Sequence, residues 1–125
     1  MKGIVLFAHG SRDPLWHRPI QAVAQRMAAL DPHVPTRCAY LELTTPTLAQ
    51  AAQELVALGV TDLHVVPMFL GVGKHAREDL PVLLEDLRRL HPQVQIICQP
   101  SVGEQTAVIE LLAQVALGGS GPMGP

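Results

Sequence analysis

The sequence predicts an α/β protein: a three-layer sandwich in which helices flank both faces of a four-stranded parallel sheet. Four short apolar runs of the kind found in buried strands alternate with four segments of helical periodicity. Apolar residues make up 48% of the chain and aromatic residues only 3%, so Leu, Val, Ile and Ala must build the core. The 125 residues fit one domain that can bury such a core without disulfides.

The first strand is expected at residues 3–8, a continuous apolar run typical of a strand buried on both faces. A helix is expected after it, because apolar residues recur at helical spacing until Asp31-Pro32 ends the pattern. Pro14 suits the first turn of this helix, where no backbone N–H donor is needed.

The second strand is expected at about residues 35–41. Thr44 or Thr45 can then cap a helix that begins at Pro46, and Gly59 is expected to end it.

The third strand is expected at residues 63–70, with Pro67 near the end of its hydrogen-bond ladder. A Gly-rich turn at residues 71–73 leads into a third helix, which is expected from His75 to Leu90 because its apolar residues recur on one face.

Residues 94–98 predict a fourth strand and residues 102–117 a last helix, so a single domain is expected at residues 1–117. Residues 118–125 are rich in Gly and Pro and are expected to form a flexible tail. Right-handed crossovers and a flavodoxin-like strand order of 2-1-3-4 would place a ligand site at the carboxyl ends of strands 1 and 3.

Composition and charge exclude several kinds of partner. A net charge of -2 and the scarcity of aromatic residues argue against nucleic-acid binding. No apolar run approaches the roughly 20 residues that span a bilayer, so no membrane association is expected. Cys38 and Cys98 are expected to be buried, reduced thiols in a cytoplasmic protein, since they form no CxxC pair and nothing indicates secretion.

Two histidines stand where metal ligands could meet. His9 leaves the first strand at its carboxyl end, and His75 follows the turn after the third strand, so the predicted topology brings both to one crevice. Neutral imidazoles bind zinc, copper, nickel, cobalt and ferrous iron, and two of them leave coordination positions open for a substrate. The alternative for His9 is a hydrogen-bonded histidine at a strand end. Ordinary structural or solvated roles are expected for the other four histidines, which are His17, His33, His64 and His91.

The turn at residues 70–75 is not a phosphate-binding loop, because Met68 occupies the position of the first glycine and His75 that of the Ser or Thr. Its glycines instead allow a flat ligand to approach the backbone, and the start of the third helix offers free N–H groups to carboxylates. Arg12, Lys74 and Arg77 could bind such carboxylates or could be solvated surface residues. Glu42, at the end of the second strand, could orient a histidine, assist proton removal, touch the substrate or be an ordinary loop acid.

Three segments together resemble a known family: His9-Gly10-Ser11-Arg12-Asp13-Pro14, then Tyr40-Leu41-Glu42 with Pro46-Thr47-Leu48, then residues 65–70 running through Gly73-Lys74-His75 to Asp79-Leu80-Pro81. They are similar to the short form of the CbiX family of sirohydrochlorin chelatases. The resemblance implies a chelatase-like fold and insertion of cobalt(II) into sirohydrochlorin for cobalamin, or of iron(II) for sirohaem. It implies no organic cofactor.

The resemblance also assigns roles to residues. It makes His9 a metal ligand and the catalytic proton acceptor, and His75 the second metal ligand. It places along the tetrapyrrole the residues Glu42, Thr45, Leu70, Gly71, Val72, Gly73, Lys74 and His75, to which Arg12 is added as a partner for the substrate carboxylates. Larger relatives have two such lobes around one cleft, so the resemblance implies a homodimer. Co2+, Fe2+ and Ni2+ all suit two histidines. A non-catalytic metal or tetrapyrrole carrier, and a subunit whose partner lobe is another protein, remain as alternatives.

Overall fold

The computed structural model, which describes residues 1–119, contains the predicted four-stranded parallel sheet. Its strands lie in the expected order β2-β1-β3-β4. They are β1 (Lys2–Ala8), β2 (Thr36–Tyr40), β3 (Asp62–Pro67) and β4 (Gln95–Cys98). Because every pairing is parallel, the carboxyl ends of all four strands lie along one edge of the sheet.

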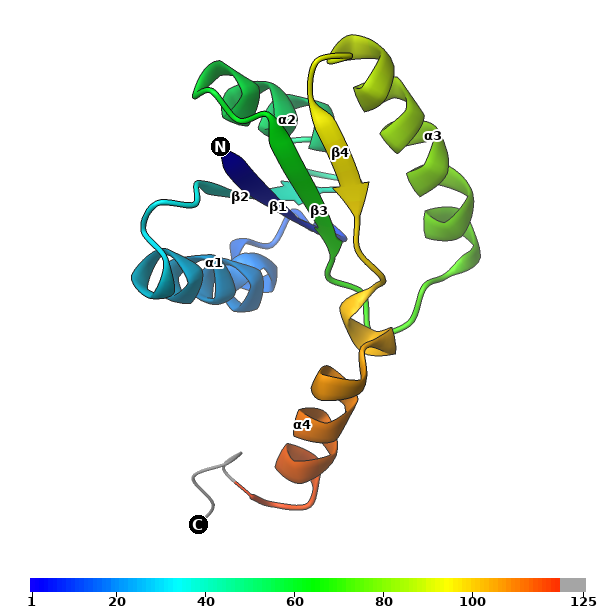
Figure 1. Ribbon diagram of the computed structural model, residues 1–125. Coiled ribbons are helices and arrows are strands. Elements are labelled where there is room, and N and C mark those ends of the chain that lie inside the picture. Colours follow the sequence, from blue (N-terminus) through cyan, green and yellow to red (C-terminus); the bar gives the residue numbers. More distant parts are fainter. Residues whose placement is uncertain (120–125) are drawn as a thin grey trace.

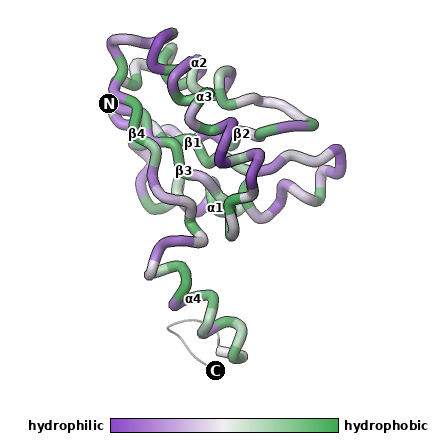
Figure 2. The backbone as a smooth tube through the Cα atoms, turned by 90° about the vertical axis from the view of Figure 1, so that its right-hand side faces the viewer, coloured by the Kyte–Doolittle hydropathy of each residue, from purple (hydrophilic) through white to green (hydrophobic). Residues whose placement is uncertain are grey.

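Helices lie on both faces of the sheet, which confirms the predicted sandwich (Figure 1). α1 (Arg18–Leu30) packs on one face, against β2 and β1. α2 (Leu48–Ala57) and α3 (Lys74–Leu90) pack on the other face. The fourth helix, α4 (Thr106–Ala116), extends away from the sheet beyond the carboxyl ends of the strands (Figure 1, Figure 2). None of the helices in residues 1–119 is long and apolar enough to cross a membrane.

The segment between β3 and α4 differs from the prediction. β3 ends at Pro67, short of the expected residue 70, and the carbonyl of Phe69 then accepts a hydrogen bond from the N–H of Gly103 at 3.0 Å. The last helix begins at Thr106, because Val102–Glu104 form a separate short 3-10 helix, η2. The proposed tail at residues 118–125 falls almost entirely outside the described residues.

The starts of the first two helices were also predicted only in part. Pro14–His17 form a 3-10 helix, η1, and regular α-helix follows it. α2 is capped by Thr47, and not by Thr44 or Thr45 as predicted, because Thr47 and Gln50 form a reciprocal capping box. Gly59 ends α2 as expected, with a φ of +103° that favours glycine.

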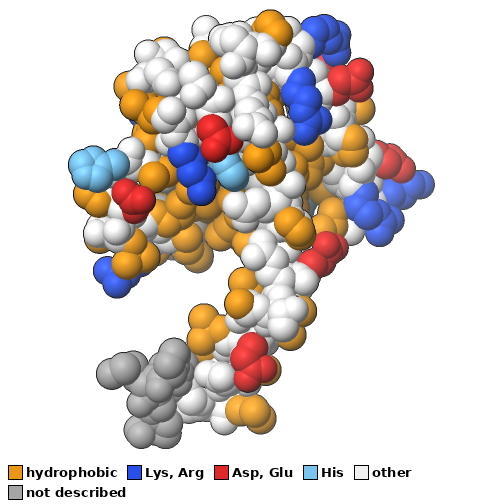
Figure 3. Space-filling view, in the orientation of Figure 1, with side chains coloured by type: hydrophobic (Ala, Val, Ile, Leu, Met, Phe, Trp, Pro, Cys, Tyr) orange, Lys and Arg blue, Asp and Glu red, His pale blue; other side chains and the backbone are white. Residues whose placement is uncertain are grey.

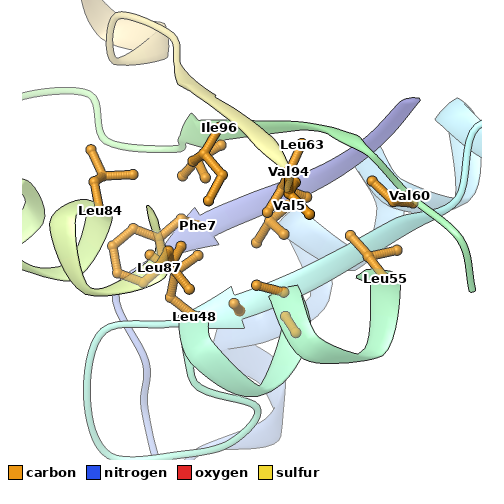
Figure 4. Close-up of a cluster of buried hydrophobic side chains, with 14 of the residues drawn as sticks. Val5, Phe7, Leu48, Leu55, Val60, Leu63, Leu84, Leu87, Val94 and Ile96 are labelled. Atoms are coloured by element: carbon orange, nitrogen blue, oxygen red, sulfur yellow. The ribbon is translucent and has the colours of Figure 1, made fainter. Parts of the chain in front are cut away.

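The main core lies between the sheet and the pair of helices α2 and α3. Val5 and Phe7 point from β1 toward the helices that carry Leu55 and Leu87, and all four side chains are buried (Figure 4). Leu63, Val94 and Ile96 extend this cluster toward β4. A smaller cluster around Leu6, Ile20 and Tyr40 joins the opposite face to α1.

The two cysteines are unpaired, as predicted, but each is only partly buried. Cys38 lies on β2 in the α1 cluster, and Cys98 lies on β4 against the main core. Two strands separate them, which places them roughly 14 Å apart at about 4.8 Å per strand, too far for a disulfide. Burial raises the pKa of both thiols, although Arg88 partly offsets this for Cys98, so both are protonated at neutral pH.

Two leucines on α3 provide a test of the main core. Leu87 is 2% exposed and Leu90 is 65% exposed. Leu87→Ala is expected to lower the free energy of unfolding by about 2–5 kcal/mol, since it leaves a cavity beneath the sheet. Leu90→Ala is expected to change it by less than about 0.5 kcal/mol. Urea denaturation followed by circular dichroism measures both, and equal losses would contradict this description of the core.

Candidate functional site

His9 stands at the carboxyl edge of the sheet, directly after the central strand β1. Its ring is paired with Glu42, whose Oε1 lies 3.2 Å from Nδ1 of His9. Glu42 follows the neighbouring strand β2, so two adjacent strand ends supply this pair. The two side chains are 47% and 40% exposed, which leaves them open to a ligand.

Two aromatic residues hold His9 in place. The ring of Phe69 lies 4.7 Å from that of His9, centroid to centroid, and Nε1 of Trp16 donates a hydrogen bond to the His9 carbonyl at 3.2 Å. In the neutral imidazole that donates from Nδ1 to Glu42, Nε2 keeps its lone pair. A carboxylate partner of this kind fixes the orientation of a metal-binding histidine and the nitrogen that carries its proton. Nε2 of His9 is therefore suited to bind a metal or to accept a proton.

A close contact between two loops supports the pair. A Cβ atom added to Gly10 would lie 1.8 Å from the carbonyl oxygen of Glu42, so only glycine fits at this position. The N–H of Leu41 donates to the carbonyl of Ala8 at 2.8 Å, which extends the pairing of β1 and β2 to the same point. The backbone thus fixes His9 and Glu42 next to each other.

His75 lies in the first turn of α3 and its side chain is exposed. This turn follows β3, the other neighbour of β1, so His75 stands above the same edge of the sheet as His9. Among residues 1–119, however, no three His, Cys, Asp or Glu side chains are grouped closely enough to form a metal site. The chain therefore brings His9 and Glu42 into contact and leaves His75 separate.

The turn that leads to His75 is open. Leu70 is 70% exposed, and nothing lies within 4 Å of a Cβ atom added to Gly71 or Gly73. Gly73 precedes α3 without a side-chain cap, so the first N–H groups of this helix are available to an anion. Val72 is partly buried against the core and anchors the turn.

The predicted basic residues are all on the surface. The side chains of Arg12, Lys74 and Arg77 are exposed, and within the described part of the chain none of them forms an ion pair. Thr45 is exposed as well, but it lines a shallow pocket beside Gln50, Gln53 and Glu54 of α2 that includes neither His9 nor His75. Thr45 and His9 therefore line different pockets.

Sequence reasoning did not identify Phe69 as a contact of His9, because its apolar run reads simply as strand. Trp16 and His9 line a pocket of about 260 Å3. The remaining walls of this pocket are Ala8, Pro19, Ile20, Val23 and Met68.

Two further histidines have structural partners, as expected. Nε2 of His17 accepts a hydrogen bond from the N–H of Ser11 at 3.2 Å, and its ring lies 4.4 Å from Tyr40. Burial, together with the nearby Cys38, raises the pKa of the Tyr40 hydroxyl despite a hydrogen bond with Gln21, so Tyr40 is neutral at physiological pH. His64 pairs with Asp62 at 3.1 Å.

Comparison with protein families gives a match to CbiX over residues 3–117. The sirohydrochlorin cobaltochelatase of Methanococcoides burtonii is 34% identical over 83 residues, which are 66% of this chain and 63% of the relative. The chain thus covers less than two thirds of that protein. The sirohydrochlorin cobaltochelatase of Sulfolobus acidocaldarius is 26% identical over 93% of this chain and 90% of its own length. The sirohydrochlorin ferrochelatase of Priestia megaterium is 26% identical over 91% of this chain and 43% of its own length.

Solved structures show the same fold. A putative cobalamin biosynthesis CbiX protein from Marinobacter aquaeolei has a TM-score of 0.79 and 29% identity, over 94% of this chain and 95% of its own. SirB from Bacillus subtilis with Fe3+ has a TM-score of 0.75 and 26% identity, over 94% of this chain but only 47% of its own.

Gly10→Ala tests the loop contact that positions His9. We expect it to lower the free energy of unfolding by about 1–3 kcal/mol, because the added methyl group must displace the Glu42 carbonyl. Gly71→Ala is the matched control, and its effect should stay within about 0.5 kcal/mol because no atom lies near its Cβ position. Thermal or urea unfolding compares the two, and an equally stable Gly10→Ala protein would contradict the contact.

Proposed function

The chain belongs to the CbiX family, and on that premise we propose that it is a sirohydrochlorin chelatase that inserts cobalt(II) into the tetrapyrrole during cobalamin biosynthesis. The relatives named sirohydrochlorin cobaltochelatase support cobalt as the metal. The second candidate is insertion of iron(II) for sirohaem, which the relative named sirohydrochlorin ferrochelatase and the structure of SirB with Fe3+ support. In either case the metal ion is a substrate, and the proposal requires no organic cofactor.

The observation that carries this proposal is the pairing of His9 with Glu42 at the open edge of the sheet. Metal insertion requires a ligand that holds the ion weakly and a base that accepts protons from the pyrrole N–H groups. Nε2 of His9 is exposed and uncommitted, while Glu42 at Nδ1 stabilises the imidazolium that protonation would create. We assign the metal to His9 and His75, and proton removal to His9.

The two roles of His9 exclude each other at any one moment, because a nitrogen that binds a metal cannot accept a proton. The lone pair of Nε2 becomes free to accept a proton once the ion has moved onto the tetrapyrrole. In this order of events, the metal leaves Nε2 of His9 as the first pyrrole nitrogens bind it. The released lone pair then accepts the two pyrrole protons one after the other and passes each of them to solvent.

The carboxylates of sirohydrochlorin are assigned to the positive groups at the rim. Arg12, Lys74 and the N–H groups at the start of α3 flank the two histidines along the chain and carry no partner among residues 1–119. The open turn from Leu70 to Gly73 is assigned to the flat face of the ring, since its glycines leave room against the backbone. Glu42 borders the ring on the other side of His9, with Thr45 farther along the same loop.

We further propose that the enzyme is a cytoplasmic homodimer in which two copies enclose one cleft. Two observations support the dimer. His9 and His75 stand on an uncovered edge of the sheet, and the chain matches 43% of the Priestia ferrochelatase and 47% of SirB, which is about one lobe of each.

The two unpaired cysteines favour a cytoplasmic location, because thiols stay reduced in that compartment. The net charge of -2 gives no support for a nucleic-acid partner, and no membrane partner is proposed.

Substitutions of the two histidines test the proposed metal insertion. His9→Ala and His75→Ala are each expected to lower the rate of metal insertion into sirohydrochlorin at least about 100-fold, since each removes a metal ligand and the first also removes the base. Anaerobic absorbance assays with cobalt, iron and nickel measure initial rates and rank the metals. His33→Ala, in a surface loop outside the site, is the control. Near wild-type rates for folded His9→Ala would overturn the proposal, and at most one equivalent of product per site would favour a carrier.

Substitutions of the only two lysines in the chain test whether a lysine binds the carboxylates of sirohydrochlorin. Lys74 stands at the carboxyl edge of the sheet, and Lys2 stands at the opposite edge, where β1 begins. Lys74→Gln is expected to raise KM for sirohydrochlorin about three- to tenfold with little change in kcat, because it removes one exposed charge from the rim. Lys2→Gln is expected to change neither constant. Equal effects of the two substitutions would mean that only net charge matters.

A further inference from the structure

The pocket that His9 and Trp16 line has no role in the metal site or in the basic rim described above, and we call it the α1 pocket. Its other walls come from the first turns of α1 and from the carboxyl ends of β1 and β3. Figure 3 shows hydrophobic side chains, in orange, gathered between α1 and the segment that leads to α4. An apolar surface thus directly borders the proposed metal ligand.

The chemistry of the α1 pocket suits an uncharged group. The side chains of residues 1–119 that line it carry no permanent charge, and most of them are hydrocarbon or thioether. The indole N–H of Trp16 is already bonded to the carbonyl of His9. A carboxylate placed here would lose its hydration and find only the His9 ring, which the proposed reaction needs for the metal. The pocket therefore favours apolar groups and excludes anions.

The walls of the α1 pocket are held in place by the core and by hydrogen bonds. Ile20 is 8% exposed and belongs to the smaller core cluster, against which Met68 packs. Trp16 is tied to the backbone by its bond to His9, at 3.2 Å. The turn that carries Trp16 is capped by Asp13, whose Oδ1 accepts the N–H of Leu15 at 2.9 Å. A ligand group that enters therefore has few side chains to order, which favours binding.

The size of the α1 pocket indicates that it receives only part of a ligand. Its volume of about 260 Å3 is below the range of about 300–1,000 Å3 that is typical of pockets enclosing a whole small molecule. Its mouth is open, since Trp16 is 60% exposed and Val23 is 39% exposed. A large flat ring can therefore place one edge in the pocket while the rest of the ring stays outside.

We propose that the α1 pocket is a specificity subsite that takes the ring methyl groups of sirohydrochlorin. The inference rests on the proposed function and adds how the enzyme selects its substrate. Those methyl groups are the only side groups of sirohydrochlorin that end without a carboxylate, and they are absent from uroporphyrin. The carboxylates, which the pocket excludes, go to Arg12, Lys74 and the start of α3.

The position of His9 connects this subsite to the reaction. His9 borders the α1 pocket and also pairs with Glu42, so it lies between an apolar surface and a polar one. A ring whose methylated edge enters the pocket keeps its pyrrole nitrogens beside His9. A ring without these methyl groups is held by its carboxylates alone, which fix its distance from His9 less well. The pocket thereby selects both the substrate and its orientation.

The test measures tetrapyrrole binding without metal, so that its result is independent of catalysis. Trp16 is the only tryptophan in the chain and lines the pocket, so quenching of its fluorescence reports binding. The wild-type chain is expected to bind sirohydrochlorin at least about tenfold more tightly than uroporphyrin. Val23→Phe fills the pocket without adding charge, and it is expected to remove most of this preference by weakening sirohydrochlorin alone.

Val82→Phe is the matched control, because Val82 is an exposed valine of α3 outside the pocket. It should keep the wild-type preference. If Val23→Phe fails to fold, Val23→Thr keeps the shape of the wall and adds a hydroxyl, and it should reduce the preference about threefold. Circular dichroism measures the folding of each variant.

The outcomes separate this inference from the proposed function. Equal affinity of the wild-type chain for both tetrapyrroles, or a folded Val23→Phe protein with the wild-type preference, would overturn the subsite. A preference that Val23→Phe abolishes, in a chain that never inserts metal, would support the subsite and refute only the proposed function. Binding of neither tetrapyrrole would refute both.

Discussion

The central position of β1 is the constraint on which the rest of this structure depends. β1 pairs in parallel with β2 on one side and β3 on the other, and its core residues Val5 and Phe7 are almost fully buried. Because all strands run the same way, the loops after β1, β2 and β3 must meet at one edge. His9, Glu42 and the turn before His75 come from these three loops. The core therefore positions the site: Phe69, which contacts the ring of His9, is buried in the main core, while His9, Glu42 and His75 themselves are exposed.

Apolar periodicity was sufficient to predict four strands that alternate with helices, and the flavodoxin-like strand order that was expected for them is the one observed, so the edge that carries the site was predicted as well. It was insufficient where contacts distant in sequence decide the outcome. The backbone contact between Gly10 and Glu42 joins residues 32 positions apart, and the ring contact between Phe69 and His9 joins residues 60 positions apart. The pairing of His9 with Glu42 was one of several roles open to that acid, and only the folded loops select it.

The position of the last helix was also decided by contacts between residues distant in the sequence. Its apolar periodicity predicts a helix over residues 102–117. In the predicted sandwich, this helix would lie on a face of its own sheet. The structure departs from this assumption because η2 is bonded to the Phe69 carbonyl and turns the chain outward. Periodicity predicts that a segment is an apolar helix, but it carries no information about the direction in which the preceding turn sends that helix.

An incomplete metal site suits the transfer of a metal better than a complete one. Four protein ligands around a zinc ion form a closed structural site, whereas sites that act on substrates keep at least one position open. Here one histidine is oriented by a carboxylate, the second stands apart in an exposed turn, and residues 1–119 contain no third ligand close to both. An ion held so loosely would pass readily to four pyrrole nitrogens, which chelate it far more strongly than two imidazoles do. Enclosure by a second copy would then supply what this open arrangement lacks, which is protection of the ion and the ring from solvent during the exchange.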